Sequence, residues 1–547
     1  MKYSFVTWLG SATLQVYTVF GYSPLDHNCI AHTDDRSFGG HYSTHKATVC
    51  EWLGVPYARP PVGDLRFAPP VKPVLLNDAF DASSYGYDCP QNPSRYIAYP
   101  NATSQYGGIY ANFVNSLNNT QSEDCLTLNI WSKPTQNFSN RIDDNSGLKP
   151  VLVWIYGGRF SAGSSNTPFY QGEFLADAQD VVVVTFNFRM NIFGFPGAPE
   201  LEMKNLALLD QRLAVSWVQD NIAVFGGDAS RITIAGQSSG SWAVSNWAYA
   251  FQDDPIVAGL ISHSGNIFSF DSNSADLAAS NWYNVSRTLG CGASESTLQC
   301  MRSPNITIDS ILAAAARVPT TGSVTRSLPA FQITEDNLTV FSRSEYVSRL
   351  AAGQLARLPH LQLQTDHESG FYRISASARG IVLPESNWTL FEQETFTCPL
   401  AADAHGRTKL NITSYRARYM ADWDNLRLFY QMEPPYDSGA YHGVDINMVV
   451  GNAEGVSGIE SSAQEERLKE TMQKAWVAFA ADPSDGLTSV MGWPKYQPDS
   501  ETLILLGYNT TSAVKHVNPT TYDFACQNLD LVFRDHSIFV YSQGNKF

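Results

Sequence analysis

The sequence predicts an α/β fold with a large, mostly parallel central sheet flanked by helices. Two apolar runs, residues 151–158 (VLVWIYGG) and 181–188 (VVVVTFNF), lack polar alternation, which is typical of strands buried on both faces. A helical pattern and two more strand-like runs follow them along the chain. Strands that alternate with helices imply parallel pairing, because a crossover helix is the usual connection between parallel strands.

Residues 205–222 (NLALLDQRLAVSWVQDNI) predict an amphipathic helix, because their apolar side chains recur every three or four positions. The expected buried stripe consists of Leu206, Leu209, Leu213 and Trp217, widened by Leu208, Val215 and Ile222. Gly226 and Gly227 end this segment. The β-branched run at residues 232–234 predicts the next strand, and residues 259–265 (GLISHSG) predict the strand after it.

The size and charge of the chain limit what it can be. It has 547 residues, of which 44% are hydrophobic, so it can bury a large core. We find no linker-like stretch and no internal repeat, and therefore expect one large domain over residues 22–547. The net charge of −16 argues against nucleic acid as a partner, since phosphate binding needs a basic face.

Residues 1–21 (MKYSFVTWLGSATLQVYTVFG) predict a signal peptide, with Lys2 ahead of an apolar run. A buried first helix is the alternative, because Ser11 and Gln15 interrupt the run. Nine glycosylation sequons follow, at Asn101, Asn118, Asn137, Asn284, Asn305, Asn337, Asn387, Asn411 and Asn509. No other stretch is apolar enough for a membrane span. We therefore expect a secreted glycoprotein without a transmembrane segment.

The cysteines also agree with an oxidising compartment. There are eight of them, and an even number suits a set of disulfides. No Cys-x-x-Cys pair occurs, which argues against a zinc or redox motif. Spacing alone leaves the connectivity open.

Residues 236–240 (GQSSG) place Ser238 between two glycines, directly after a predicted strand. One interpretation is a plain turn. The other is a nucleophile elbow, a tight strand-to-helix turn that exposes the serine hydroxyl. The order of strands and helices favours the elbow, because sites in open α/β sheets form beyond the carboxyl ends of the strands.

Several blocks of the chain together resemble the type-B carboxylesterase/lipase family of α/β-hydrolases, which includes cholinesterases and fungal lipases. In sequence order these blocks are residues 54–70 (GVPYARPPVGDLRFAPP), 123–131 (EDCLTLNIW), 154–164 (WIYGGRFSAGS), 187–195 (NFRMNIFGF), 205–228, 236–241 (GQSSGS) and 439–443 (GAYHG). The resemblance spans most of the chain and is closest in pattern to secreted fungal carboxylesterases and lipases. It implies an α/β-hydrolase fold and ester hydrolysis without a metal or cofactor.

The resemblance also implies a catalytic triad. A serine hydroxyl needs a base within reach, and the base needs an orienting acid. Ser238 is the expected nucleophile, and His442 in residues 439–443 is the expected base. For the acid, the family pattern favours Glu368 in residues 358–372 (LPHLQLQTDHESGFY), with Asp366 as the second candidate and a solvated loop charge as the structural alternative.

An oxyanion hole is expected from the backbone N–H groups of Ser239, Gly158 and Arg159. The family usually has glycine in place of Arg159 and often glutamate in place of Gln237. If the Arg159 side chain enters the acyl pocket, it favours acyl groups that carry a carboxylate. The alternative is that the side chain points away and pairs with an acidic residue, so that only its N–H matters.

Two disulfides are implied by the resemblance, Cys89–Cys125 and Cys291–Cys300. The pairing of Cys29, Cys50, Cys398 and Cys526 stays open at this point, although the proximity of Cys29 and Cys50 makes that pair plausible. No tryptophan lies between Cys89 and Cys125, where cholinesterases carry theirs, so a choline-type site is not expected.

The predicted function is that of a secreted serine carboxylic-ester hydrolase acting on a small-molecule or lipid ester through an acyl-enzyme. Two alternatives remain. The same triad can transfer the acyl group to an alcohol or form a lactone if the site excludes water. A non-catalytic binding protein of cholinesterase type is disfavoured by the intact set of Ser238, Glu368 and His442, although Arg159 departs from the family pattern. The substrate and the oligomeric state are not predicted.

Overall fold

The computed structural model describes residues 29–527, except residues 34–35, 75–77, 116, 135–146, 295, 323–324, 326 and 431–436. The signal peptide predicted for residues 1–21 and the sequon at Asn137 lie outside the described residues.

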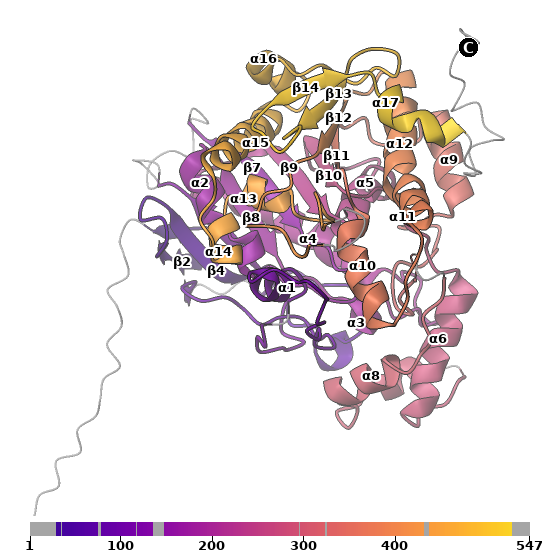
Figure 1. The fold of residues 1–547 in the computed structure, drawn as a ribbon. Helices are drawn as coiled ribbons and strands as arrows, with labels where there is room; N and C mark the ends of the chain where they lie inside the picture. Colours follow the sequence, from indigo (N-terminus) through magenta and orange to yellow (C-terminus); the bar gives the residue numbers. More distant parts are fainter. Residues whose placement is uncertain are drawn as a thin grey trace, which may run out of the picture.

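A sheet of 11 strands runs through the middle of the molecule, in the order β14-β13-β12-β11-β10-β9-β7-β8-β6-β4-β3 (Figure 1). Neighbouring strands from β13 to β8 are parallel, and the strands at both edges are antiparallel. The strands are β3 (His41–Tyr42), β4 (Cys50–Pro56), β6 (Thr127–Ser132), β7 (Lys149–Ile155), β8 (Val182–Phe186), β9 (Gly227–Gln237), β10 (Gly259–His263), β11 (His360–Thr365), β12 (Ser414–Tyr419), β13 (Leu503–Leu506) and β14 (Val514–Val517). The predicted α/β class with a mostly parallel sheet is therefore confirmed.

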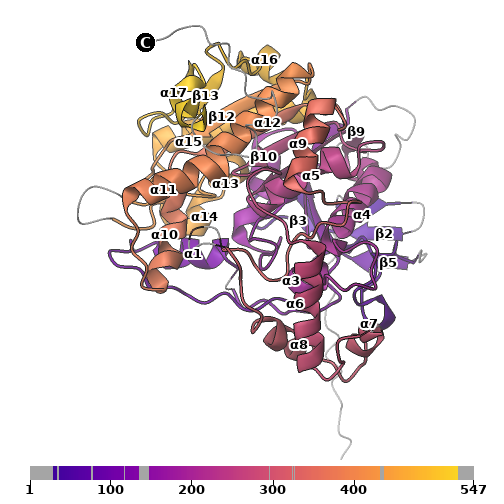
Figure 2. The same cartoon turned by 90° about the vertical axis from the view of Figure 1, so that its right-hand side faces the viewer.

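Helices cover both faces of this sheet. In Figures 1 and 2, α2 and α15 lie on one side of it and α4 and α5 on the other. The helices are α1 (Tyr106–Phe113), α2 (Glu173–Ala178), α3 (Asn191–Gly194), α4 (Leu206–Asn221), α5 (Ser239–Ala250), α6 (Ala275–Thr288), α7 (Thr297–Met301), α8 (Ile308–Ala315), α9 (Arg343–Ala352), α10 (Ser369–Ala378), α11 (Glu385–Glu392), α12 (Cys398–Lys409), α13 (Ile446–Val450), α14 (Ala453–Ser457), α15 (Ala463–Ala481), α16 (Gly486–Met491) and α17 (Thr520–Asp523). Every residue of β7, β8 and β10 is buried between the two layers, which explains why these runs are apolar without alternation.

Two smaller units flank the sheet. A three-stranded sheet is formed by β1 (Ile30–His32), β2 (Arg36–Gly39) and β5 (Asp78–Asp81). Helices α6, α7 and α8 lie at the bottom of the molecule in Figure 2 and surround a separate apolar cluster that contains Phe67 and Trp282.

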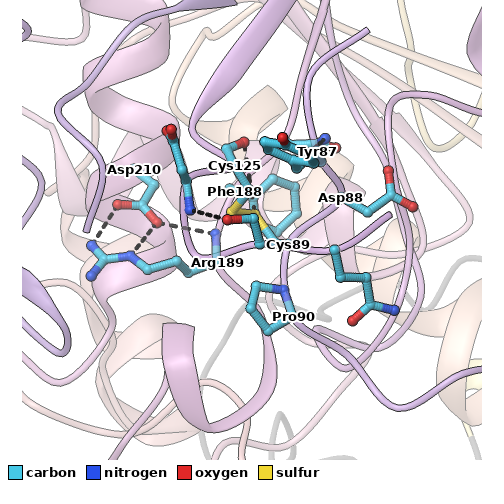
Figure 3. Close-up of a disulfide and its surroundings, with 12 residues drawn as sticks. Tyr87, Asp88, Cys89, Pro90, Cys125, Phe188, Arg189 and Asp210 are labelled. Atoms are coloured by element: carbon cyan, nitrogen blue, oxygen red, sulfur yellow. Dashed lines mark hydrogen bonds and ion pairs between the residues drawn. A yellow bond between two sulfur atoms is a disulfide. The ribbon is translucent and has the colours of Figure 1, made fainter. Parts of the chain in front are cut away.

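Helix α4 confirms the predicted helix, but the buried face is rotated from the expected stripe. Leu209 and Leu213 are only half-buried, whereas the polar residues Asp210 and Gln211 are buried. Asp210 is buried because its carboxylate accepts two hydrogen bonds from the Arg189 guanidinium, at 2.8 and 2.6 Å (Figure 3). Pattern analysis missed this face because it counts apolar residues only, and a buried ion pair is invisible to it.

Four disulfides join all eight cysteines in pairs. They are Cys29–Cys50, Cys89–Cys125, Cys291–Cys300 and Cys398–Cys526. The Cys89–Cys125 bridge, which joins the loop after β5 to the start of β6, lies beside the Arg189–Asp210 ion pair, which joins the loop after β8 to α4 (Figure 3). The structure thus contains the two pairs implied by the family resemblance and decides the two pairs that the sequence left open.

Candidate active site

Ser238 occupies a tight turn between the end of β9 and the start of α5. Its backbone has φ 58° and ψ −120°, a conformation that an L-residue adopts only under strain. Its N–H donates to the carbonyl of His263 on the neighbouring strand β10, at 2.9 Å, which secures the turn. This geometry matches a nucleophile elbow and not a plain surface turn.

The two glycines around Ser238 are required by close packing of the backbone. A Cβ atom on Gly236 would lie 2.6 Å from the backbone of Gly240, and a Cβ atom on Gly240 would lie 2.1 Å from the carbonyl oxygen of Ile155 in β7. No side chain fits at these distances. The Gly-x-Ser-x-Gly spacing therefore lets α5 start directly against the sheet, with the serine at the turn.

Glu368 and His442 come together from distant parts of the sequence. Glu368 lies just after β11, where its Oε1 accepts from the Thr365 N–H at 2.9 Å. Its Oε2 lies 2.6 Å from Nδ1 of His442. Because a carboxylate only accepts, Nδ1 is the donor and Nε2 is left to accept on the side of Ser238. Both residues are buried, at 1% and 3% exposure.

Asp366, the second candidate for the acid, has a different partner. Its carboxylate accepts from Nε of Arg418 at 2.6 Å, and its side chain is 36% exposed. The structure therefore brings Glu368 to His442 and leaves Asp366 in an ion pair with Arg418 of β12.

A second buried histidine–carboxylate pair attaches the loop that carries His442 to strand β10. Asp445 accepts from Nδ1 of His263 at 2.6 Å, and Nε2 of His263 accepts from the indole N–H of Trp476 at 2.9 Å. His263 is the residue whose carbonyl binds the Ser238 N–H. The same short strand thus positions both the serine turn and the histidine loop.

Tyr372 is a site residue that the sequence analysis missed. Its hydroxyl lies 3.3 Å from Nε2 of His442. Burial raises the pKa of this phenol well above its usual value. No motif marks Tyr372, but it lies one helical turn after Glu368, on the first turn of α10, and that spacing was the available signal.

The glycine-rich loop after β7 presents backbone N–H groups beside Ser238. Gly158 has φ 104° and Arg159 has φ 59°, so the loop coils in the left-handed region even at a residue with a side chain. Within the described part of the chain, the N–H groups of Gly158 and Arg159 have no acceptor. The N–H of Ser239 lies in the first turn of α5, where helical donors lack an internal partner. These are the three groups predicted to form the oxyanion hole.

Two cavities meet at Ser238, and Arg159 and Tyr372 line both of them. The His442 cavity has a volume of about 180 Å³ and also contains Phe113, Phe371 and Gln237. The second, which we call the Phe270 cavity, extends past Ser239 and is lined further by Ser269, Phe270, Asp271, Gln332, Phe391 and Thr395, among others. Much of the lining of the His442 cavity comes from residues 94–170, which precede Ser238 in the sequence.

The Arg159 side chain does not point away to an acidic partner. It lies at the junction of the two cavities, and it forms no ion pair or hydrogen bond with any residue that the structure describes. Desolvation by the surrounding protein lowers the pKa of its guanidinium, and the nearby Arg379 acts in the same direction.

Comparison with known proteins gives a consistent result. A model of the carboxylesterase family matches residues 36–372. A chlorogenic acid esterase of Aspergillus niger is 32% identical over 87% of this chain and 90% of its own length, and secreted lipase 5 of Gibberella zeae is 31% identical over 87% and 89%. A solved PNB esterase structure superposes with a TM-score of 0.73 at 25% identity, covering 91% of this chain and 99% of that one. The chain belongs to the carboxylesterase family and is a carboxylic ester hydrolase with the α/β-hydrolase fold.

Proposed function

We propose that the protein is a secreted serine carboxylesterase in which Ser238 is the nucleophile, His442 the general base and Glu368 the orienting acid. The observation that carries this proposal is the 2.6 Å contact between Glu368 and His442, located beside a strained serine at the carboxyl end of β9. A serine at an elbow, a base and an orienting carboxylate form the arrangement that acyl transfer requires.

The reaction proceeds in two halves. The Ser238 oxygen attacks the ester carbonyl while Nε2 of His442 takes the serine proton, and the bond from Nδ1 to Glu368 stabilises the imidazolium. The N–H groups of Gly158, Arg159 and Ser239 bind the oxyanion. The imidazolium then gives its proton to the departing alcohol, leaving an acyl-enzyme. Water, deprotonated by Nε2, attacks this acyl group and releases the acid.

The direction of proton transfer indicates which part of the ester each cavity holds. The leaving alcohol must lie next to the histidine that protonates it, so the alcohol part of the ester occupies the His442 cavity. The acyl part extends past Ser239 into the Phe270 cavity, which has both aromatic and polar walls. Aromatic side chains in each cavity favour esters with at least one flat or cyclic group over long flexible chains.

Secretion is supported by features beyond the leader sequence. All eight sequon asparagines that lie among the described residues are exposed, so each is open to glycosylation. The four disulfides suit an extracellular location. Of the helices in the described part of the chain, none is both long and apolar enough to cross a membrane.

The direct test is active-site labelling combined with a substrate panel. A serine-reactive fluorophosphonate should label the wild type and fail to label Ser238→Ala, and the variant should lose ester turnover while keeping its circular dichroism spectrum. The panel contains p-nitrophenyl esters of rising chain length, aromatic esters and chlorogenic acid, the ester named for one relative. Turnover that survives in Ser238→Ala would disprove the assignment. Product analysis with added alcohol distinguishes hydrolysis from acyl transfer.

A further inference from the structure

The His442 cavity is positively charged and contains no acid. Among its described lining residues the only permanently charged side chain is Arg159, and there is no aspartate or glutamate. The chain as a whole has a net charge of −16, so the positive charge of this cavity is opposite in sign to that of the whole protein. A solute that carries a cation is disfavoured in such a cavity, and an anion is favoured.

The N–H donors of the Arg159 guanidinium have no acceptor among the described residues. It lies in the cavity without a carboxylate partner among the described residues, and Arg379 nearby adds a second positive charge. Arg159 is exposed, so a carboxylate can reach its guanidinium from solvent. A carboxylate that docks on its planar fork supplies two parallel, charge-assisted hydrogen bonds.

Gln237 is neutral, whereas a glutamate at this position would repel an anion. It lies directly before Ser238, is 1% exposed and lines the His442 cavity. Its Nε2 has no hydrogen-bond partner among the residues that the structure describes. A carboxylate at this position would neutralise Arg159 across the cavity. The amide keeps the wall neutral and leaves one more N–H donor without an acceptor there.

Two acidic side chains around the cavities already have partners. Glu368 accepts from His442 and from the Thr365 backbone, behind the imidazole. Asp271 lines the Phe270 cavity, where it pairs with Arg343 at 2.7 Å. The Phe270 cavity therefore contains a carboxylate, while the His442 cavity does not. This difference places the anion-binding capacity of Arg159 on the alcohol side of the ester.

We propose that the His442 cavity selects esters whose alcohol part carries a carboxylate, which binds the Arg159 guanidinium. The volume of about 180 Å³ and the rings of Phe113 and Phe371 suit an alcohol with one six-membered ring, since a cavity of roughly 150 Å³ holds benzene. The preferred substrates are thus esters of cyclic hydroxy acids. This inference rests on the proposed function, because the catalytic role of His442 defines the alcohol side.

The test compares two acetyl esters that differ only in charge on the leaving group, 4-acetoxybenzoate and 4-acetoxybenzamide. The kcat/KM ratio of acid over amide should fall by about 10-fold to 100-fold in Arg159→Met, the size of a charge-assisted hydrogen bond. Methionine keeps the backbone N–H and a Cβ at the same left-handed φ, so the oxyanion donor is retained. Arg159→Lys should keep part of the preference. A ratio unchanged in Arg159→Met would overturn the proposal.

A second pair of esters places the charge on the acyl side instead. The kcat/KM ratio of phenyl hemisuccinate over phenyl butyrate should stay within about twofold in Arg159→Met, because that carboxylate lies in the Phe270 cavity. If this ratio falls and the benzoate ratio does not, Arg159 recognises the acyl group and the assignment is wrong. Gln237→Glu gives an independent test, since it should lower the benzoate preference at least tenfold.

The proposed function and this inference fail in different ways. Turnover that persists in Ser238→Ala contradicts the function. Turnover that depends on Ser238, with charge ratios indifferent to Arg159, contradicts only the inference. A readout without turnover is protection of Ser238 from fluorophosphonate by 4-hydroxybenzoate, the leaving group alone. Protection should be stronger in the wild type than in Arg159→Met, and equal protection would count against the proposal.

Discussion

Glu368 and Asp366 are two residues apart, yet only one of them reaches His442. Thr365 ends β11, and the turn that follows directs Asp366 to Arg418 and Glu368 to the imidazole. The position of the carboxylate, and not its chemistry, therefore decides its role.

We predict that Glu368→Gln lowers kcat by a factor of about 10⁴, because an amide cannot stabilise the imidazolium and favours the wrong tautomer, as in other triads. Asp366→Asn is the matched control, with the same chemical change two residues away. It should cost less than about tenfold, since it breaks only a partly exposed ion pair. Steady-state kinetics on one ester measures both variants, and a reversed ranking would show that Asp366 is the acid.

The position of Tyr372 in the structure bears directly on the reactivity of Ser238. Its hydroxyl hydrogen-bonds to Nε2 of His442, the atom proposed to accept the Ser238 proton, so it competes with the serine for that nitrogen. We predict that Tyr372→Phe speeds fluorophosphonate labelling by up to about fivefold, the value of one neutral hydrogen bond of ~1 kcal/mol. The rate of labelling measures this without a rate-limiting deacylation. A tenfold fall would mean instead that the hydroxyl relays the serine proton.

At the scale of elements, the active site depends on β10 as much as on β9. The carbonyl of His263 in β10 binds the serine turn, and its ring binds Asp445 on the histidine loop. Helix α15 completes this arrangement through Trp476, which donates to the same ring. One strand and one helix therefore fix the distance between Ser238 and His442.

We predict that Asp445→Asn destabilises the fold by about 3 kcal/mol, because it leaves a buried polar pair without its charge. It should also lower kcat, since the loop that carries His442 loses its attachment to β10. Thermal unfolding and kinetics measure the two effects separately. Asp424→Asn is the control, because that carboxylate is 87% exposed in its contact with Arg427. An Asp445→Asn protein as stable and active as this control would exclude the positioning role.

At the scale of the whole molecule, the disulfides differ in how far apart in sequence the two joined cysteines lie. Cys398–Cys526 joins α12 to the end of the described chain across a separation of 128 residues, while Cys291–Cys300 spans 9. A crosslink stabilises mainly by limiting the unfolded chain, and longer loops gain more.

We predict that the Cys398→Ala/Cys526→Ala double variant loses about 5 kcal/mol of unfolding free energy, against about 2.5 kcal/mol for Cys291→Ala/Cys300→Ala. Denaturant unfolding of both double variants measures the difference. Equal losses, or a larger loss at the short loop, would show that native-state strain outweighs chain entropy here.

The sequence by itself determined the fold class, the serine and its glycines, and the order of strands around them. These follow from local rules, since hydrophobic periodicity sets each strand and helix and the close approach of Gly240 to β7 admits no side chain. The family resemblance added His442, Glu368 and two disulfides.

Only the tertiary structure decided the remaining features. The buried face of α4 depends on an ion pair between Asp210 and Arg189, which no apolar pattern records. The contact of the Tyr372 hydroxyl with His442 depends on how separate loops meet. So does the place of Arg159 between two cavities without an ion pair to any described residue. Sequence patterns encode burial along one element, whereas the partner of a polar side chain is set by packing between elements, and that is why the chemistry of substrate selection appeared only in three dimensions.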